Sequence, residues 1–371
     1  MASILLALFL LQGPDPVAQA VKALDDNHPQ EAVALLKPVV EKDPQNMVAW
    51  FHLGLAQSLL GQDEEAVVAY RKVLGDKPDL YEARLNLAQV LHRLKRPDEA
   101  KPLLEAAIEQ RPKAAAPQVM LGAALIDLKD YAGAESRLRE ALALDDKNAD
   151  GWSLLGRALQ LQGKLDEAIV AFEKTGDKSA AAAVREQRGL ELLNAGKPAE
   201  AAVLFERVVA DAPTPAVKYA LAIAYLRQKE PDKSIALAED ILKTNPKDFE
   251  VRMFYGRLLR DQKNYPQAAP QFLEAVRLKP DAVEAWSELT GMLILLQQYP
   301  QALQGLEKLR SMQGETPAYW WFRATVLDAI KQPKDALAAY RRFLELSQGK
   351  SPDEEFKARQ RVRILQKVVS K

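Results

Sequence analysis

The sequence predicts an all-α solenoid, a stack of helical hairpins, on three observations. A segment of about 34 residues returns along almost the whole chain. Within each segment, apolar residues recur three and four positions apart, which fits one face of an α-helix and not a strand. Small residues also recur once per segment in two fixed columns. Units of this kind bury their apolar faces only against their neighbours, so the hairpins must stack.

The columns of small residues are expected to mark the crossing of the two helices in each hairpin. Helices approach closely only where the facing side chains are small, so larger residues such as Phe172 should fill the space between neighbouring units. The first column reads Ala32, Ala66, Ala100, Ala134, Ala168, Ala201, Ser234, Ala268, Ala302 and Ala336. The second column reads Ala20, Gly54, Ala88, Gly122, Gly156, Gly189, Ala222, Gly256, Thr290 and Ala324.

The predicted turns agree with helical hairpins. Gly61, Gly163 and Gly196 follow first helices, where a residue in the left-handed conformation ends a helix. Prolines such as Pro44 and Pro78 follow second helices, because the residue before a proline is driven out of the α region. Each unit is therefore predicted to hold a first helix, a tight turn, a second helix and a turn that contains proline.

This pattern resembles the tetratricopeptide repeat family, whose signature is W-x2-L-G-x2-Y, then A-x3-F, then P, at a period of about 34 residues. The second unit matches it with Trp50, Leu53, Gly54, Ala66, Tyr70 and Pro78. Ten units begin near residues 13, 47, 81, 115, 149, 182, 215, 249, 283 and 317, and together they cover 13–348. The resemblance implies a right-handed α-solenoid superhelix whose first helices line a concave groove.

Two adjacent units, those that begin near residues 149 and 182, are one residue short. In the first of these, Thr175 and Ala180 stand where an apolar residue and a proline are expected, and Gly176 should end the second helix early. One interpretation is a tolerated deletion in a turn. The other is a local change of superhelical pitch that divides the array into two halves.

Residues 349–371 depart from the repeat and predict a C-terminal capping helix near 352–369. Ser351 with Glu354 forms a capping-box pattern, and Pro352 suits the first helical position. Phe356, Val362, Leu365 and Val369 are expected to share one side of this helix. A terminal helix with its other side polar would shield the open end of the stack from water.

The N-terminal segment 1–12 contains an uninterrupted apolar run, Ile4–Leu11, which is too short to span a bilayer as a helix. Its length suits the apolar core of a bacterial signal peptide, and residues 18–20 read A-Q-A, a cleavage motif. The expected localisation is therefore periplasmic or envelope-associated. No Lys or Arg precedes the run, so an apolar helix packed over the first unit, in a cytoplasmic protein, is the alternative.

Composition excludes several function classes. The chain has 51 basic and 51 acidic residues, so no electrostatic footprint for nucleic acid is expected. It contains no cysteine and three histidines, and it has no Gly-rich phosphate loop, H-E-x-x-H or G-x-S-x-G motif. His52 and His92 are expected to be solvated groove residues and not metal ligands. We therefore expect no enzyme, no cofactor, no metal and no small-molecule substrate.

The predicted function is a non-catalytic scaffold that binds a protein segment on the concave surface of the first helices. Aromatic residues with nearby arginines dominate binding hot spots, and later units offer both, while earlier units offer polar residues. The predicted partner-binding residues are Tyr219, Met253, Phe254, Arg257, Arg260, Trp321, Phe322, Asn86 and Gln89. The alternative for the aromatic residues is that they pack on the second helix of a neighbouring unit.

Other functions of the same fold stay open. Family members that bind acidic chaperone tails carry Lys and Asn at fixed inner positions, and only Asn86 matches here, so that class is disfavoured. A structural assembly subunit of an envelope complex would use its outer faces and leave the groove empty. A cytoplasmic regulator remains if the N-terminal run is not a signal.

Overall fold

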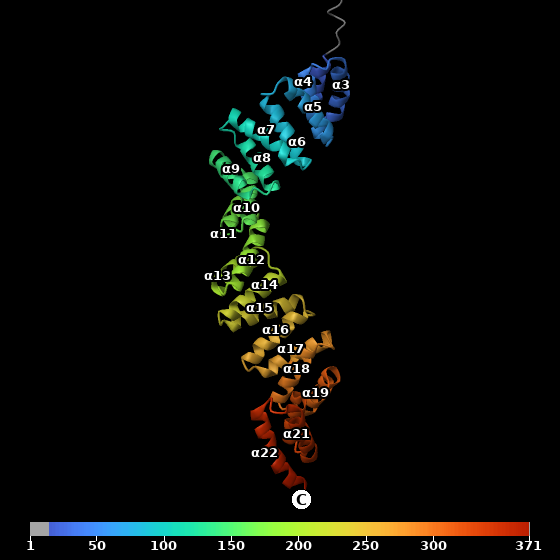
Figure 1. Ribbon diagram of the computed structural model, residues 1–371, viewed down its shortest axis with the longest axis vertical. Coiled ribbons are helices and arrows are strands. Elements are labelled where there is room, and N and C mark those ends of the chain that lie inside the picture. Colours follow the sequence, from blue (N-terminus) through green and yellow to red (C-terminus); the bar gives the residue numbers. More distant parts are fainter. Residues whose placement is uncertain (1–14, 371) are drawn as a thin grey trace, which may run out of the picture. The chain divides into compact units, whose positions relative to one another are not determined.

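A computed structural model describes residues 15–370, and within them it contains 21 helices and no strand (Figure 1). The predicted all-α repeat fold is confirmed. The first helices of the hairpins are α2 (Pro16–Asp25), α4 (Met47–Leu59), α6 (Tyr81–Arg93), α8 (Ala115–Asp127), α10 (Ala149–Leu161), α12 (Lys178–Asn194), α14 (Pro215–Arg227), α16 (Phe249–Asp261), α18 (Val283–Leu295) and α20 (Pro317–Ala329). The second helices are α3 (Pro29–Lys42), α5 (Asp63–Asp76), α7 (Pro97–Gln110), α9 (Tyr131–Leu144), α11 (Leu165–Thr175), α13 (Pro198–Asp211), α15 (Pro231–Thr244), α17 (Tyr265–Leu278), α19 (Tyr299–Gln313) and α21 (Pro333–Ser347).

The chain divides into two compact units, one up to Arg185 and the other from Glu186 onward. The division falls inside α12, in the part of the array where successive repeats are one residue short. Within each unit, successive helices pack on one another in chain order, so each hairpin buries its apolar side against the next.

The first column of small residues lies at the helix crossings, as predicted. Every member from Ala32 to Ala336 is at most 1% exposed. In the seventh hairpin the two columns touch directly, because the Ser234 hydroxyl donates a hydrogen bond of 2.8 Å to the Ala222 carbonyl oxygen. Larger side chains at these positions would push the two helices apart.

The second column makes a contact that differs from the expectation. A Cβ placed on Gly156 would lie 2.9 Å from the Phe172 ring, and one on Gly256 would lie 2.7 Å from the Phe272 ring. Phe172 thus packs inside its own hairpin, against the backbone of α10. Glycine leaves room for a ring from the second helix, which lies against the backbone of the first.

Each first helix ends on a residue in the left-handed conformation, with φ between +58° and +76°. These residues are Asn27, Gly61, Lys95, Lys129, Gly163, Gly196, Lys229, Lys263, Gln297 and Lys331. The predicted glycine turns are confirmed, and the remaining repeats place Asn, Lys or Gln in the same strained conformation. Gly176, with φ +75°, ends α11 early, also as predicted.

The ninth repeat ends differently from most of the others. Gly314 stands 34 residues after Pro280, at the position of the repeat's proline. Without that proline, α19 continues to Gln313 and then turns at Gly314, whose φ is +79°. The segment between α19 and α20 is therefore a glycine turn, and it borders the cavity described below.

The C-terminal helix α22 (Pro352–Val369) is present as predicted, but two of its details are corrected. The Ser351 side chain makes no capping hydrogen bond. Glu355, and not Glu354, accepts hydrogen bonds from the Ser347 hydroxyl (2.7 Å) and the Gly349 N–H (2.6 Å).

Phe356 is 62% exposed and does not join the buried side of α22. That side is formed by Ala358, Val362, Leu365 and Val369, which pack on the last hairpin. At about 100° per residue, Phe356 lies nearly opposite Leu365 on the helix, so the two side chains cannot share one face.

The predicted N-terminal segment 1–12 lies outside the described residues. The A-x-A motif, by contrast, lies within α2, and Ala20 is fully buried in the first hairpin. Among the described helices, none has both the length and the apolar character needed to cross a membrane.

Candidate partner-binding surfaces

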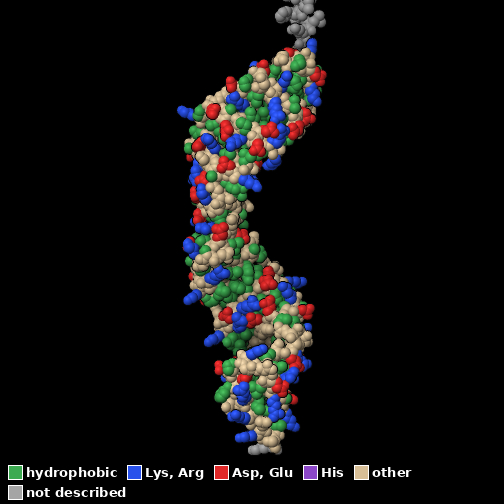
Figure 2. All heavy atoms as spheres, viewed as in Figure 1, with side chains coloured by type: hydrophobic (Ala, Val, Ile, Leu, Met, Phe, Trp, Pro, Cys, Tyr) green, Lys and Arg blue, Asp and Glu red, His purple; other side chains and the backbone are tan. Residues whose placement is uncertain are grey.

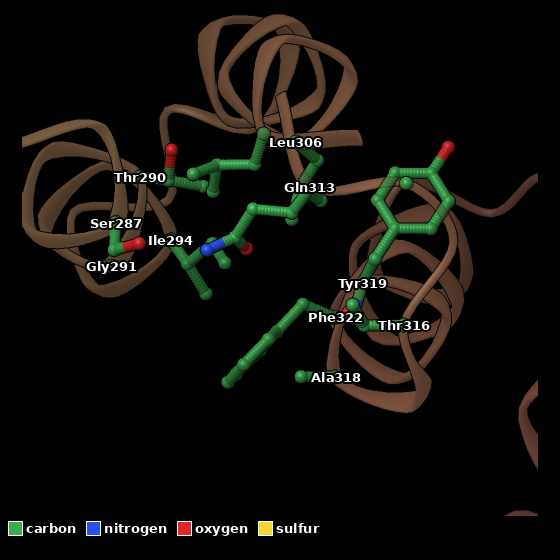
Figure 3. Close-up of a pocket in the computed structure, with 12 residues that line it drawn as sticks. Ser287, Thr290, Gly291, Ile294, Leu306, Gln313, Thr316, Ala318, Tyr319 and Phe322 are labelled. Atoms are coloured by element: carbon green, nitrogen blue, oxygen red, sulfur yellow. The ribbon is translucent and has the colours of Figure 1, made fainter. Parts of the chain in front are cut away.

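A cavity of about 180 Å³ lies between α18, α19 and α20 (Figure 3). First helices α18 and α20 form two of its walls, and the end of α19 forms the third. Its lining residues carry no charge: they are Ser287, Thr290, Gly291, Ile294, Leu306, Leu309, Gln313, Gly314, Thr316, Ala318, Tyr319 and Phe322.

Two glycines leave this space open. A Cβ added at Gly291, in the middle of α18, would meet no heavy atom within 4 Å. Gly314 supplies the turn into α20, which begins after Thr316 accepts a hydrogen bond of 3.1 Å from the Tyr319 N–H. The cavity thus results from a missing side chain on one wall and the proline-free turn on another.

Uncharged polar groups interrupt the apolar walls. Thr290 is 2% exposed, and its hydroxyl has no hydrogen-bond partner among the described residues. It occupies the small-residue column, and it fits because Gly305 of α19 lacks the Cβ that would collide with it. The Gln313 side chain extends between Ile294 and Phe322 (Figure 3). An amide at this place can both donate and accept a hydrogen bond.

Phe322 is the predicted site residue that borders this cavity. Its side chain is 43% exposed, so it leaves apolar surface uncovered beside the cavity. Trp321, the neighbouring prediction, packs instead on α21, with its ring 6.0 Å from Tyr340 and 5.3 Å from Phe343 between centroids. Trp321 therefore packs on a second helix, as in the alternative for the aromatic residues, and does not lie free in the groove.

Tyr219 and Phe254 lie together at another place in the same unit. Their rings meet edge to face with 5.1 Å between centroids, and both are half-buried against the core. Met253 is only 1% exposed and belongs to the buried cluster that includes Leu289 and Met292 of α18. The expectation that Met253 offers groove surface is therefore corrected, because its flexible side chain fills core space.

Arg257 and Arg260 are already paired within the chain. The Arg260 Nη1 lies 2.6 Å from the Glu288 Oε1, and the Arg257 Nε lies 3.2 Å from the same oxygen. Partial burial alone would lower the pKa of both guanidinium groups, but hydrogen bonds to Glu288 and to a second carboxylate, Glu284 for Arg257 and Asp261 for Arg260, outweigh it and raise the pKa of each. A partner carboxylate would have to compete with Glu288 for these arginines.

A wider recess of about 450 Å³ lies between α6, α7, α8 and α10, in the compact unit that ends at Arg185. Gln89 and His92 line it, and the His92 Nδ1 lies 3.3 Å from an Asp127 oxygen. Asn86 is half-buried beside the Tyr70 hydroxyl and does not line the recess. Within residues 15–370, no group of three or more His, Cys, Asp or Glu side chains is placed to hold a metal ion.

Lys and Arg side chains are interspersed with Asp and Glu over the face shown in Figure 2. That face carries no extended area of one charge, and its green areas are apolar. The distribution suits the balanced composition of the chain and favours recognition through apolar surface over recognition through long-range charge.

Several lining residues of the α18–α20 cavity were not predicted, among them Thr290, Ile294 and Gln313. Two signals in the sequence pointed to them. Thr290 is the member of the second column that is neither Gly nor Ala, and Gly314 replaces the repeat's proline. Both departures fall in the ninth repeat.

Tetratricopeptide repeat profiles match most of the chain. One profile matches residues 17–80, 187–249, 219–283 and 295–351, and a second matches 60–125 and 125–186. A curated relative, Protein O-mannosyl-transferase Tmtc3 of Drosophila melanogaster, is 32% identical over 117 residues. That alignment covers 31% of this chain, and the chain spans only 13% of the relative's length.

Two solved structures illustrate the likeness in fold. MamA from Desulfovibrio magneticus RS-1 is 23% identical with a TM-score of 0.42, covering 44% of this chain and 95% of its own. A tetratricopeptide repeat protein from Parabacteroides merdae is 16% identical with a TM-score of 0.38, covering 75% of this chain and 97% of its own. These likenesses concern the fold alone.

Proposed function

Because the chain belongs to the tetratricopeptide repeat family, whose fold is typical of protein–protein interaction scaffolds, we propose that it is a non-catalytic scaffold that binds a segment of a partner protein. The observation that carries this proposal is the uncharged cavity beside the exposed Phe322 ring. It joins first helices of neighbouring repeats, where the family resemblance places the binding groove.

The cavity has the size for one large apolar side chain. Its volume of about 180 Å³ is close to the roughly 150 Å³ of an engineered apolar cavity that binds benzene. Ile294, Leu306 and Phe322 would contact a leucine, methionine or phenylalanine side chain of the partner. Burial of such a side chain contributes about 1.5–3 kcal/mol, so further contacts along the first helices must supply the rest of the affinity.

The polar groups of the cavity suit a peptide backbone. The Gln313 amide and the Ser287 hydroxyl are uncharged donors and acceptors among its lining residues. They would bond the N–H and C=O groups that flank an apolar anchor residue. The paired arginines Arg257 and Arg260 would add an acidic preference only where a partner displaces Glu288.

Export to the periplasm or envelope is part of the proposal and rests on the apolar run Ile4–Leu11. The first hairpin restricts where a signal peptidase can cut. Ala20 is buried within α2, so cleavage after it would remove half of that helix, and the processed chain should begin before Pro16. N-terminal sequencing of the protein from its host tests this. An intact Met1 or Ala2 on cytoplasmic material would reverse the localisation.

Partner binding can be tested with a substitution that fills the cavity. Gly291→Leu places a side chain into open space and replaces a helical glycine, so the variant should fold at least as stably as the parent. Captured partners from native extracts, identified by mass spectrometry, should be lost with Gly291→Leu and reduced with Phe322→Ala. Leu295→Ala is the matched control, because Leu295 is 53% exposed on the same helix but does not line the cavity. Unchanged capture by all three variants would place the site elsewhere.

A further inference from the structure

A second uncharged groove, of about 480 Å³, flanks the same α18–α19 hairpin. It lies between α17, α18 and α19. Its lining residues are Pro266, Ala269, Pro270, Leu273, Trp286, Leu289, Leu293, Leu296, Gln298, Gln301, Gln304 and Gly305. On α18 these residues point about 130° away from those that line the first cavity, so the groove is a separate surface.

The lining of this groove excludes a charged occupant. None of its residues is charged, although charged residues make up 27% of the chain. A charged group seated there would lose water without gaining a counter-charge, which is strongly unfavourable. Trp286 and the leucines of α18 line one side, and Leu273 of α17 on another side is 40% exposed. The occupant that matches this surface is apolar and neutral.

A row of three glutamines forms one wall. Gln298, Gln301 and Gln304 follow one another at intervals of three along α19, over about 9 Å. None of their side chains makes a hydrogen bond in the part of the chain that the structure describes. Each amide offers two donors and one acceptor, the complement of a peptide N–H and C=O.

We infer that this groove binds an extended, uncharged segment of a partner protein that carries several leucine-like side chains. A helix satisfies its own backbone groups, whereas an extended chain leaves N–H and C=O groups that need partners. The glutamine row spans about three residues of a strand, at roughly 3.3 Å each. The groove's volume is about three times that of the benzene-binding cavity, which gives room for about three apolar side chains.

This inference does not rest on the proposed function. The groove and the first cavity share the α18–α19 hairpin but no lining residue. One place where they approach each other is Gly305 of the groove, which lies against the Thr290 hydroxyl of the cavity. Variants on one side can therefore be chosen that leave the other side unchanged.

The test uses isothermal titration calorimetry with the full chain and a blocked peptide, acetyl-Lys-Lys-Gly-Gly-Leu-Ser-Leu-Ser-Leu-amide. Its alternating leucines lie on one side of an extended chain, and the lysines keep it soluble. The peptide should bind, and a control with aspartate in place of the central leucine should bind about tenfold more weakly or not at all. Leu273→Glu and Gln301→Ala, both at exposed positions, should weaken binding, and Leu273→Glu should do so more.

Variants of the first cavity decide where the peptide sits. Gly291→Leu and Phe322→Ala should leave the affinity unchanged. Loss of binding with Gly291→Leu but not with Leu273→Glu would overturn the inference and place the peptide in the first cavity. Equal binding of the aspartate peptide, or no binding up to the solubility limit, would also overturn it. Circular dichroism of each variant separates a lost contact from a lost fold.

Discussion

Two glycines on first helices of the compact unit that begins at Glu186 should respond in opposite ways to substitution by alanine. Gly256 lies in the middle of α16 and Gly291 in the middle of α18, so alanine gains the same helix propensity at both, about 0.8–1 kcal/mol. A Cβ on Gly256, however, would lie 2.7 Å from the fully buried ring of Phe272. A Cβ on Gly291 would meet nothing within 4 Å.

The contact geometry sets the size of the difference. Extra methyl groups in a packed core cost about 1–3 kcal/mol, so Gly256→Ala should be destabilised by up to about 2 kcal/mol after the propensity gain is subtracted. The tenth hairpin combines Ala324 with Tyr340, which shows that a small shift of the ring is possible and favours the lower half of this range. Gly291→Ala should be stabilised by about 1 kcal/mol.

Urea unfolding followed by far-ultraviolet circular dichroism measures both variants against the parent. If Gly256→Ala is as stable as Gly291→Ala, the ring does not lie against the first helix. The close contact between the glycines of the second column and the rings of the second helices would then be refuted.

Three further outcomes follow from the same structure. Lys263 sits at φ +60°, a conformation that costs a non-glycine residue about 1 kcal/mol or more, so Lys263→Gly should raise the melting temperature slightly; a fall would show that the turn is not strained. Burial alone would raise the pKa of Glu135, but hydrogen bonds from Lys164, Gln162 and Arg139 lower it to about 2. Because the folded pKa is depressed, the stabilisation is present at neutral pH and is lost as the pH falls from about 4.5 towards 2. Glu135→Gln should therefore lower the urea midpoint at pH 7 and not near pH 2; an equal effect at both would contradict this. Phe254→Ala should cost roughly 2–4 kcal/mol because Phe254 packs on the core, whereas Phe322→Ala should cost less than about 1 kcal/mol; equal losses would show that Phe322 is a core residue.

The hairpins can be predicted well from the sequence, because the residue types that each helix crossing requires recur in ten repeats. The column from Ala32 to Ala336 is small at every position, so a helix crossing is the consistent explanation. The side chain that faces each small residue is harder to predict from the sequence. Glycine at positions such as Gly156 shows that something approaches closely, but both a small residue and an aromatic ring satisfy that condition. The structure selects the ring of Phe172.

The binding residues are harder to predict, because the inward-facing positions of the repeat describe a typical repeat and not each individual hairpin. That register places Met253 and Phe322 on the groove, yet one is buried and the other is exposed. Exposure depends on how far apart neighbouring hairpins pack, which the local sequence does not encode. Arg257 and Arg260 show the same limit, since their pairing with Glu288 requires the neighbouring helix α18 to be in place.

Residues that depart from the repeat pattern indicate features of individual hairpins that the pattern itself does not predict. Thr290 departs from the Gly and Ala of its column, Gly314 replaces the repeat's proline, and both fall in the ninth repeat together with Gly305. Thr290 needs Gly305 for space, and Gly314 frees the turn that borders the cavity. A repeat that only supports the stack gains nothing from a buried hydroxyl without a partner, which costs about 1–3 kcal/mol. The α18–α19 hairpin instead separates two uncharged recesses, so its irregular residues are better explained by the surfaces they shape than by the stack they join.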